Sequence, residues 1–173
     1  PNMNEDLKNI YLIGMEGVGK STLGRLLANQ LKWAFVDFNE ILEAIYNRPI
    51  NEINNTFEIN ALRNIEENIL AELSRGLHQV FACNSDLVIK GSKLKLMDAT
   101  GITIWLDAPT SDLLERIEGR NMEIQGKNIS EKILREMIED RKKYYSKANI
   151  RIPTDSLTPH KTLKTIIEVL KNL

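Results

Sequence analysis

The sequence predicts an α/β fold in which a five-stranded parallel sheet is flanked by helices on both faces. Short apolar runs alternate with longer segments of helical period, and several runs are apolar throughout, as in strands covered on both faces. No repeat or linker interrupts the 173 residues, so we expect one domain over 1–173. The predicted strands are residues 9–14, 33–37, 79–83, 102–106 and 149–152.

The last predicted helix has the clearest boundary signals in the chain. Thr158 is a good N-cap and Pro159 fits the first helical position, where its missing N–H is not needed. Apolar residues then recur with helical period at Leu163, Ile166 and Leu170. A parallel sheet of this kind holds its ligands at the carboxyl ends of its strands.

Composition and charge limit the classes of partner. The 23 basic and 24 acidic residues leave a net charge of -1, which gives no general attraction for nucleic acid or an anionic membrane. No apolar run approaches the roughly 20 residues that span a bilayer, and the N-terminal stretch is polar. The single Cys83 has no partner for an internal disulfide. We therefore expect a cytoplasmic protein, a monomer, with no nucleic-acid or membrane partner.

One motif carries specific chemistry. GMEGVGKST, residues 14–22, matches the phosphate-binding pattern G-x-x-x-x-G-K-[ST] and lies between a predicted strand and a predicted helix. Glycines let the backbone N–H groups surround a phosphate, and the following helix contributes its positive N-terminus. Lys20 is expected to reach the phosphates of ATP, and the Ser21 hydroxyl to bind Mg²⁺. The residues expected to hold the nucleotide here are Gly14, Gly17, Val18, Gly19, Lys20, Ser21 and Thr22.

A carboxylate ends the second predicted strand. Asp37 follows WAFV, at the same sheet edge as the phosphate motif. There it can hold a water of the Mg²⁺ shell, because Mg²⁺ keeps several waters when it binds to proteins. The simpler interpretation is a cap for the helix that continues from Asn39. We expect Ser21 and Asp37 to form the metal site.

From the phosphate motif onward the sequence resembles the shikimate kinase family, without gaps from Gly14 to about Asp86. The resemblance implies a P-loop kinase architecture with a lid at about 118–128, and transfer of the ATP γ-phosphate to a shikimate hydroxyl. The family motif Phe-Arg-x-x-Glu falls on residues 62–66, so Arg63 is expected to hold the acceptor carboxylate. Glu66, three residues later on the helix, is expected to orient Arg63. The simpler alternative is a surface ion pair.

The resemblance assigns further roles after residue 100. Arg141 matches the second arginine of the carboxylate clamp. Arg116 lies at the basic entry to the lid, where it is expected to stabilise the transferred phosphoryl group together with Lys20 and Mg²⁺. Asp37 is expected to contribute to catalysis through the metal. Thr154 and Asp155 fall in the loop that lies beside the adenine in the family.

Three departures from the family pattern affect the acceptor half. Asn39 stands where the family has the aspartate that accepts the hydroxyl proton, and an amide cannot take that proton at pH 7. Residues 84–86, Asn-Ser-Asp, replace three glycines, which makes Ser85 an expected acceptor contact and Asp86 a candidate replacement base. The lid's Arg-Pro-Leu-Leu is absent, although Arg120 lies nearby.

The sequence leaves three functional hypotheses open. The first is a shikimate kinase with an altered acceptor site. The second is a kinase for another small hydroxylated acid, which the changes at Asn39 and residues 84–86 favour. The third is a catalytically inactive nucleotide-binding relative, which would bind ATP without turnover stimulated by any acceptor.

Overall fold

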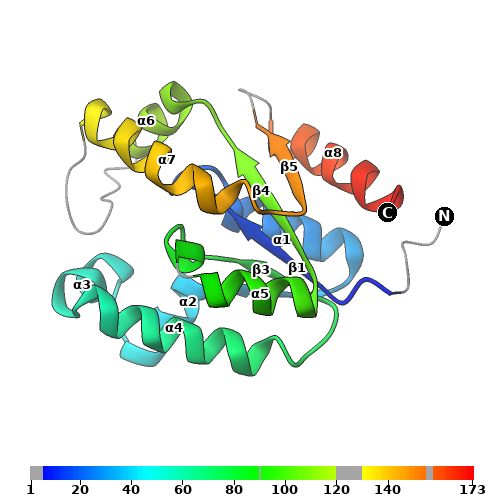
Figure 1. Cartoon of the computed structure of the whole chain (residues 1–173), viewed down its shortest axis with the longest axis horizontal. Coiled ribbons are helices and arrows are strands. Elements are labelled where there is room, and N and C mark those ends of the chain that lie inside the picture. Colours follow the sequence, from blue (N-terminus) through cyan, green and yellow to red (C-terminus); the bar gives the residue numbers. More distant parts are fainter. Residues whose placement is uncertain (1–5, 90, 120–129, 155–157) are drawn as a thin grey trace.

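The computed structural model describes residues 6–89, 91–119, 130–154 and 158–173. Its centre is a parallel sheet of five strands, which confirms the predicted fold class. The strands lie in the order β2-β3-β1-β4-β5 (Figure 1). They are β1 Asn9–Ile13, β2 Ala34–Asp37, β3 Gln79–Ala82, β4 Ile102–Asp107 and β5 Ile150–Pro153, each within one residue of the predicted range at either end.

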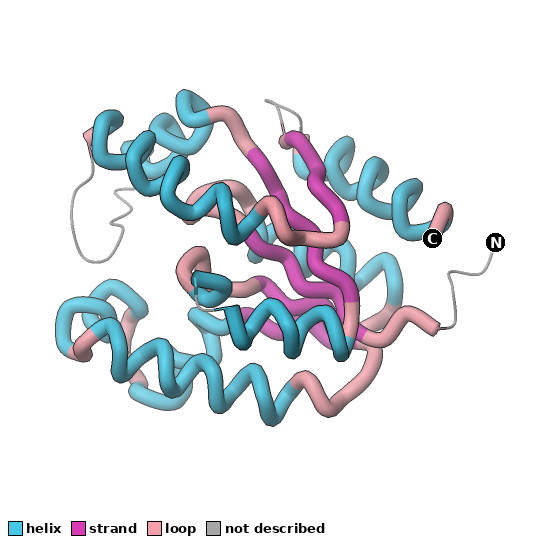
Figure 2. Tube along the Cα trace, viewed as in Figure 1, coloured by secondary structure: helices cyan, strands magenta, loops and turns pink. Residues whose placement is uncertain are grey.

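Helices cover both faces of the sheet (Figures 1 and 2). On one face α1 packs against α8, and α4, α5 and α7 lie over the other face. The helices are α1 Lys20–Leu31, α2 Phe38–Tyr46, α3 Ile50–Thr56, α4 Ile59–Leu73, α5 Gly91–Thr100, α6 Thr110–Gly119, α7 Glu131–Tyr145 and α8 Pro159–Lys171, with a short 3₁₀ turn η1 at Leu87–Ile89. The side chain of Thr158 caps α8 by accepting from the Lys161 N–H, as its sequence predicts.

The central strand β1 is buried along its whole length. Tyr11, in the middle of it, stacks on Phe81 of β3 with ring centroids 4.8 Å apart. Its hydroxyl lies 2.7 Å from Thr100 Oγ1, so the polar end of this buried ring has a partner. The apolar pattern that predicted a strand covered on both faces therefore gives a rigid support for the loop that follows β1.

A second, smaller core lies beside the main one. Leu42, Ile53 and Leu62 are buried against one another and join α2, α3 and α4. Leu62 also lines a pocket at the carboxyl edge of the sheet, so this small core supports one wall of that pocket. Most of the remaining buried apolar residues belong to the main core around the sheet.

The carboxyl edge of the sheet carries the polar residues of interest. The phosphate motif follows β1, Asp37 ends β2, and Asn84 comes two residues after β3. Asp107 ends β4, and its carbonyl accepts from the N–H of Thr154, which follows β5, at 2.9 Å. Since parallel strands all end at one edge, these segments meet there although they are far apart in the sequence.

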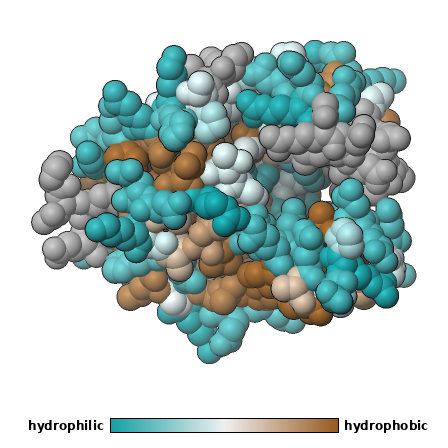
Figure 3. Space-filling view, turned by 180° about the vertical axis from the view of Figure 1, so that it is seen from behind, coloured by the Kyte–Doolittle hydropathy of each residue, from teal (hydrophilic) through white to brown (hydrophobic). Residues whose placement is uncertain are grey.

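The described surface carries both hydrophilic and hydrophobic side chains. No described helix is both long and apolar enough to cross a membrane. From behind, hydrophilic side chains alternate with hydrophobic patches, the largest of them along the lower edge of that view (Figure 3). Large exposed hydrophobic side chains include Ile45 on α2, Leu77 before β3 and Ile133 on α7. Such side chains, exposed on separate elements, are common on protein surfaces.

Candidate active site

The phosphate loop, residues 14–22, takes the backbone shape that its glycines allow. Gly14 has φ 145°, and a Cβ there would come within 2.6 Å of the carbonyl oxygen of Leu106 in β4. Gly19 has φ 103° and is the residue from which α1 begins. Both positions are in the region of φ that disfavours L side chains, so the motif's glycines are required by geometry. The loop then leads directly into the N-terminus of α1, where an anion is stabilised.

Lys20 folds over this loop. Its Nζ donates to the carbonyl oxygens of Gly14 at 2.7 Å and Met15 at 2.8 Å. Burial lowers the pKa of Lys20 to about 8, although the nearby Glu16 carboxylate partly offsets burial. The ammonium group thus lies among the backbone groups that would surround a phosphate.

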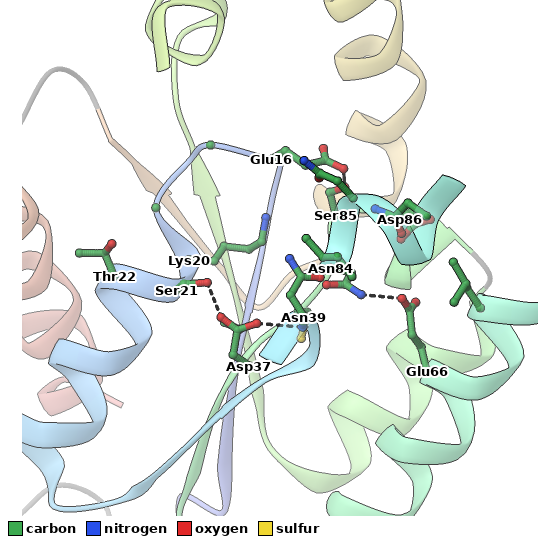
Figure 4. Close-up of a pocket in the computed structure, with 18 of the residues that line it drawn as sticks. Glu16, Lys20, Ser21, Thr22, Asp37, Asn39, Glu66, Asn84, Ser85 and Asp86 are labelled. Atoms are coloured by element: carbon green, nitrogen blue, oxygen red, sulfur yellow. Dashed lines mark hydrogen bonds between the residues drawn. The ribbon is translucent and has the colours of Figure 1, made fainter. Parts of the chain in front are cut away.

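Ser21 and Asp37 converge beside Lys20 (Figure 4). The Ser21 hydroxyl donates to Asp37 Oδ2 at 2.5 Å, and Asp37 Oδ1 accepts from the Asn39 N–H at 2.9 Å. Asp37 therefore caps α2 and faces the phosphate loop at once, so the two interpretations of this residue are compatible. A hydroxyl and a carboxylate oxygen are suitable ligands for Mg²⁺, which takes its other ligands from water and phosphate. Thr22 is exposed on the first turn of α1 and points away from Asp37 (Figure 4).

Two other residues expected at the nucleotide lie near the loop. Arg116 Nη1 donates to the carbonyls of Gly17 at 3.1 Å and Val18 at 3.2 Å, so α6 holds a guanidinium against the phosphate loop. Thr154 is buried at the end of β5, and its hydroxyl has no hydrogen-bond partner among the described residues. Asp155, Arg120 and nearly all of the predicted lid lie outside the described residues.

A pocket of about 550 Å³ extends from the phosphate loop to α3, α4 and the segment after β3. One end of the pocket, the nucleotide end, is formed by the loop with Lys20, Ser21 and Asp37. The other, the acceptor end, is formed by Asn39, Leu62, Glu66 and residues 84–86. The structure thus brings part of the predicted nucleotide set and two of the three departures from the family pattern into one cavity. Gly14, Val18, Arg116 and Thr154 are not among the residues that line it.

The partner of Arg63 differs from the prediction. Arg63 Nε lies 3.5 Å from Asp86 Oδ2, and both side chains are largely buried. Glu66, the expected partner of Arg63, instead accepts from Asn84 Nδ2 at 2.5 Å. Residues 84–86 would carry no side chains in the glycine pattern of the family, and here two of them supply the partners of Arg63 and Glu66.

Glu66 has an unusual environment for a carboxylate. It is 5% exposed, and its Oε2 has no hydrogen-bond partner among the described residues. Burial and, to a smaller extent, the neighbouring charge of Asp86 raise the pKa of Glu66 to about 7, against opposing effects of Asn84, Lys93 and Arg63. Lys93, buried in α5, donates to the Arg63 carbonyl at 3.3 Å.

Arg141 is held by a carboxylate that sequence reasoning missed. Its Nη1 lies 3.0 Å from Glu16 Oε2 and donates to Ser85 Oγ at 3.0 Å, and the Ser85 hydroxyl in turn donates to Glu16. Tyr145 donates to the Ser85 carbonyl at 2.5 Å. Burial acts to lower the pKa of Arg141, but Glu16 and Tyr145 outweigh burial and raise it. The sequence does contain one indication of Glu16: it is an acidic residue inside a motif that is expected to bind an anion.

The comparisons with known proteins agree with this geometry. The family profile described as "Shikimate kinase" matches residues 16–171. A shikimate kinase of Persephonella marina is 32% identical over 162 residues, which are 93% of this chain and 98% of that protein. The solved shikimate kinase from Acinetobacter baumannii in complex with shikimate has a TM-score of 0.88 at 26% identity, covering 96% of this chain and 94% of that one. The crystal structure of shikimate kinase from Aquifex aeolicus has a TM-score of 0.80 at 29% identity, covering 95% of this chain and 96% of that one.

A phosphate loop at the carboxyl edge of a 2-3-1-4-5 parallel sheet, at one end of a pocket that continues into a polar chamber, defines a P-loop kinase that acts on small molecules. Within that class, the profile match and the relatives are specific. The chain belongs to the shikimate kinase family.

Proposed function

We propose that this chain transfers the γ-phosphoryl group of MgATP to a ring hydroxyl of shikimate. The observation that carries the proposal is a continuous pocket that joins the phosphate loop to a polar chamber with two buried arginines behind it. A kinase needs such a pocket, because donor phosphate and acceptor hydroxyl must meet in line with water excluded. Membership in the shikimate kinase family supports shikimate as the acceptor.

At the nucleotide end, Lys20 and Arg116 would stabilise the charge that develops on the phosphoryl oxygens. Lys20 lies at the loop carbonyls, and Arg116 lies against Gly17 and Val18. Ser21 and Asp37 would hold Mg²⁺, which neutralises charge on the phosphate oxygens when bound. The buried hydroxyl of Thr154, which has no hydrogen-bond partner among the described residues, is suited to a polar group of the nucleotide base. Asp155 is proposed beside it.

At the acceptor end, Asn39 and Ser85 would hold ring hydroxyls by hydrogen bonds. Arg63 and Arg141, the residues expected at the acceptor carboxylate, lie behind this end and are paired with Asp86 and Glu16. Asn39 cannot take the hydroxyl proton. Phosphoryl transfer has a loose transition state in which positioning and charge stabilisation dominate, so the loss of a base slows the reaction without preventing it. One chain supplies both ends of the pocket, which supports a monomer. A cytoplasmic location would keep the lone Cys83 reduced and supply ATP.

The acceptor end favours a second candidate, a kinase for another small hydroxylated acid. Asn84 and Asp86 place side chains in the pocket wall where the family pattern has glycines. These side chains change the shape of the chamber in which shikimate would bind. The reaction type and the nucleotide end are the same in both candidates.

The test is ADP release from MgATP with and without shikimate, with a Lys20→Ala variant as the blank. We expect shikimate to stimulate ADP release in the native chain and not in the variant, and mass spectrometry to detect a phosphorylated acceptor. Stimulation by a different hydroxylated acid, with none by shikimate, would support the second candidate. ATP binding without stimulation by any acceptor tested would contradict the proposed function.

A further inference from the structure

Two carboxylates of the pocket wall neutralise the two arginines that stand behind the acceptor end. Glu16 from the phosphate loop pairs with Arg141 at 3.0 Å, and Asp86 from the segment after β3 pairs with Arg63 at 3.5 Å. The two pairs involve four different elements of the chain, and each arginine has its own carboxylate. An arginine that is already paired in this way has less attraction left for the carboxylate of a ligand.

The carboxylates, rather than the arginines, face the cavity. Among the described residues that line it, four are acidic and one, Lys20, is basic; the acidic ones are Glu16, Asp37, Glu66 and Asp86. Neither Arg63 nor Arg141 is part of this lining. The side chain of Arg141 is 5% exposed, whereas that of Glu16 is 26% exposed, so the carboxylate lies between the guanidinium and the open space.

The charges around the acceptor end balance. Three basic groups, Arg63, Lys93 and Arg141, face three acidic groups, Glu16, Glu66 and Asp86. Burial acts to raise the pKa of Glu16, but Arg141, Lys20 and the Ser85 hydroxyl outweigh burial and lower it, so Glu16 is ionised at neutral pH. With Glu66 ionised, a ligand carboxylate entering this chamber meets no uncompensated positive charge.

Hydrogen-bond acceptors are available to a ligand in the same chamber. Glu66 Oε2 is buried, unpartnered among the described residues and part of a side chain that lines the cavity. Asn39 and Asn84 also line it, and their amides can accept from a hydroxyl (Figure 4). These groups suit a ligand that brings donors, such as ring hydroxyls or an ammonium group, better than one that brings a second carboxylate.

We infer that Glu16 and Asp86 determine acceptor specificity: they make the pocket recognise a polyhydroxylated ring through its hydroxyls and not through a carboxylate. A ring that carries an uncharged or amine-bearing group in place of the carboxylate is then accepted as readily as the acid. This inference rests on the proposed phosphoryl transfer and adds the class of acceptor. It assigns to Glu16 a function in acceptor selection in addition to its place in the phosphate loop.

The experiment compares shikimate with its uncharged carboxamide as acceptors. We expect the native chain to use the two with kcat/KM values within about threefold of each other, because the acid gains no net ion pair. In Glu16→Gln and Asp86→Asn, each of which frees an arginine without changing side-chain size, the preference for the acid is expected to rise by about tenfold per variant, through KM rather than kcat. Glu72→Gln is the matched control, since it removes a carboxylate from an exposed pair with Arg75.

Equilibrium binding of both compounds, measured by calorimetry with a non-hydrolysable ATP analogue present, gives a readout that needs no turnover. A native chain that prefers the acid by more than about thirtyfold in binding, with no further change in either variant, would overturn the inference. That result together with phosphorylation of shikimate would leave the proposed function intact. A shift toward the acid in both variants, without turnover of either compound by any protein, would support the inference about the pocket and contradict the proposed function.

Discussion

The nucleotide end and the acceptor end of the pocket are held in shape by different kinds of interaction. At the nucleotide end, backbone shape and a few short contacts determine the arrangement: Gly14 and Gly19 set the loop, and Lys20 lies against the loop carbonyls. At the acceptor end, side chains determine it, through the pairs of Glu16 with Arg141 and Asp86 with Arg63. The first kind of site has little freedom to change, because a phosphate must fit its backbone N–H groups.

The second kind changes with single substitutions. Replacing a glycine by aspartate after β3 adds a charge to the wall without disturbing β3, because residues 84–86 lie beyond the strand. The chain therefore retains the phosphate motif and differs from the family pattern where the acceptor would bind. Substitutions at the two ends are expected to differ in their effect on kcat. Those at the nucleotide end should lower kcat strongly, and those at the acceptor end should raise or lower it by smaller factors.

The largest effect is expected for Lys20→Ala. Removing a cation that stabilises the transferred phosphoryl group should lower kcat by about 10²–10³-fold, in line with the loss of one preorganised electrostatic contact. The measurement is steady-state ADP release, together with thermal unfolding to verify the fold. Lys171→Ala, at an exposed lysine in the last turn of α8, is the control and should leave both quantities unchanged. Unchanged ATP binding and turnover in Lys20→Ala would contradict the assignment of the phosphate loop.

Asp37→Asn separates the two roles of Asp37. Asparagine caps a helix as well as aspartate does, so α2 should keep its stability, with a change in the free energy of unfolding of less than about 0.5 kcal/mol. The lost charge should weaken Mg²⁺ binding, raise the Mg²⁺ concentration needed for half-maximal activity and lower kcat by about tenfold or more. Asp37→Ala, which also removes the cap, should be less stable by about 1 kcal/mol. An unaltered Mg²⁺ dependence in both variants would leave Asp37 as a cap only.

The same contrast explains which parts of the molecule could be predicted from the sequence. The five strands, the cap at Thr158 and the phosphate loop depend on local patterns of burial, capping and glycine, and the sequence shows these directly. The pairs at the acceptor end, Arg141 with Glu16 and Asp86 with Arg63, join residues that are far apart in the chain. Which carboxylate reaches which arginine depends on the tertiary structure. Arg63 and Glu66 lie on one helix as expected, but the ion pair that the structure shows for Arg63 is with Asp86.

Asn39→Asp tests whether the acceptor end lacks only a base. Asn39 is exposed to the pocket at the start of α2, and its own N–H is bound by Asp37. A carboxylate there could accept the hydroxyl proton, so we expect kcat to rise by about tenfold, at the lower part of the range for general-base catalysis. Glu40→Asp, at the neighbouring residue paired with Arg25 on the surface, is the control. Absence of any gain would show that Asp86 or Glu66 already accepts the proton, or that proton transfer does not limit the rate.

The smallest effect concerns stability and depends on pH through Glu66. Because the pKa of Glu66 is raised from 4.5 to about 7 in the folded chain, the folded state binds more protons than the unfolded state between these values. The favourable contribution of the neutral carboxyl is then fully present below pH 4.5 and is lost as the pH rises through 7. Glu66→Gln keeps an acceptor for the Asn84 amide and has no proton to lose. Relative to this variant, the native chain should lose up to about 3 kcal/mol in free energy of unfolding between pH 4.5 and pH 8.

Urea unfolding of both proteins across that range measures the difference, with Glu72→Gln as an exposed reference. Parallel pH profiles for the native chain and Glu66→Gln would mean that Glu66 titrates like an ordinary carboxyl group. In that case Glu66 is ionised at neutral pH, and the balance of three basic and three acidic groups around the acceptor end holds in full. The expected loss of stability would instead mean that Glu66 is partly protonated near neutral pH, where it can donate a hydrogen bond to an acceptor as well as accept one.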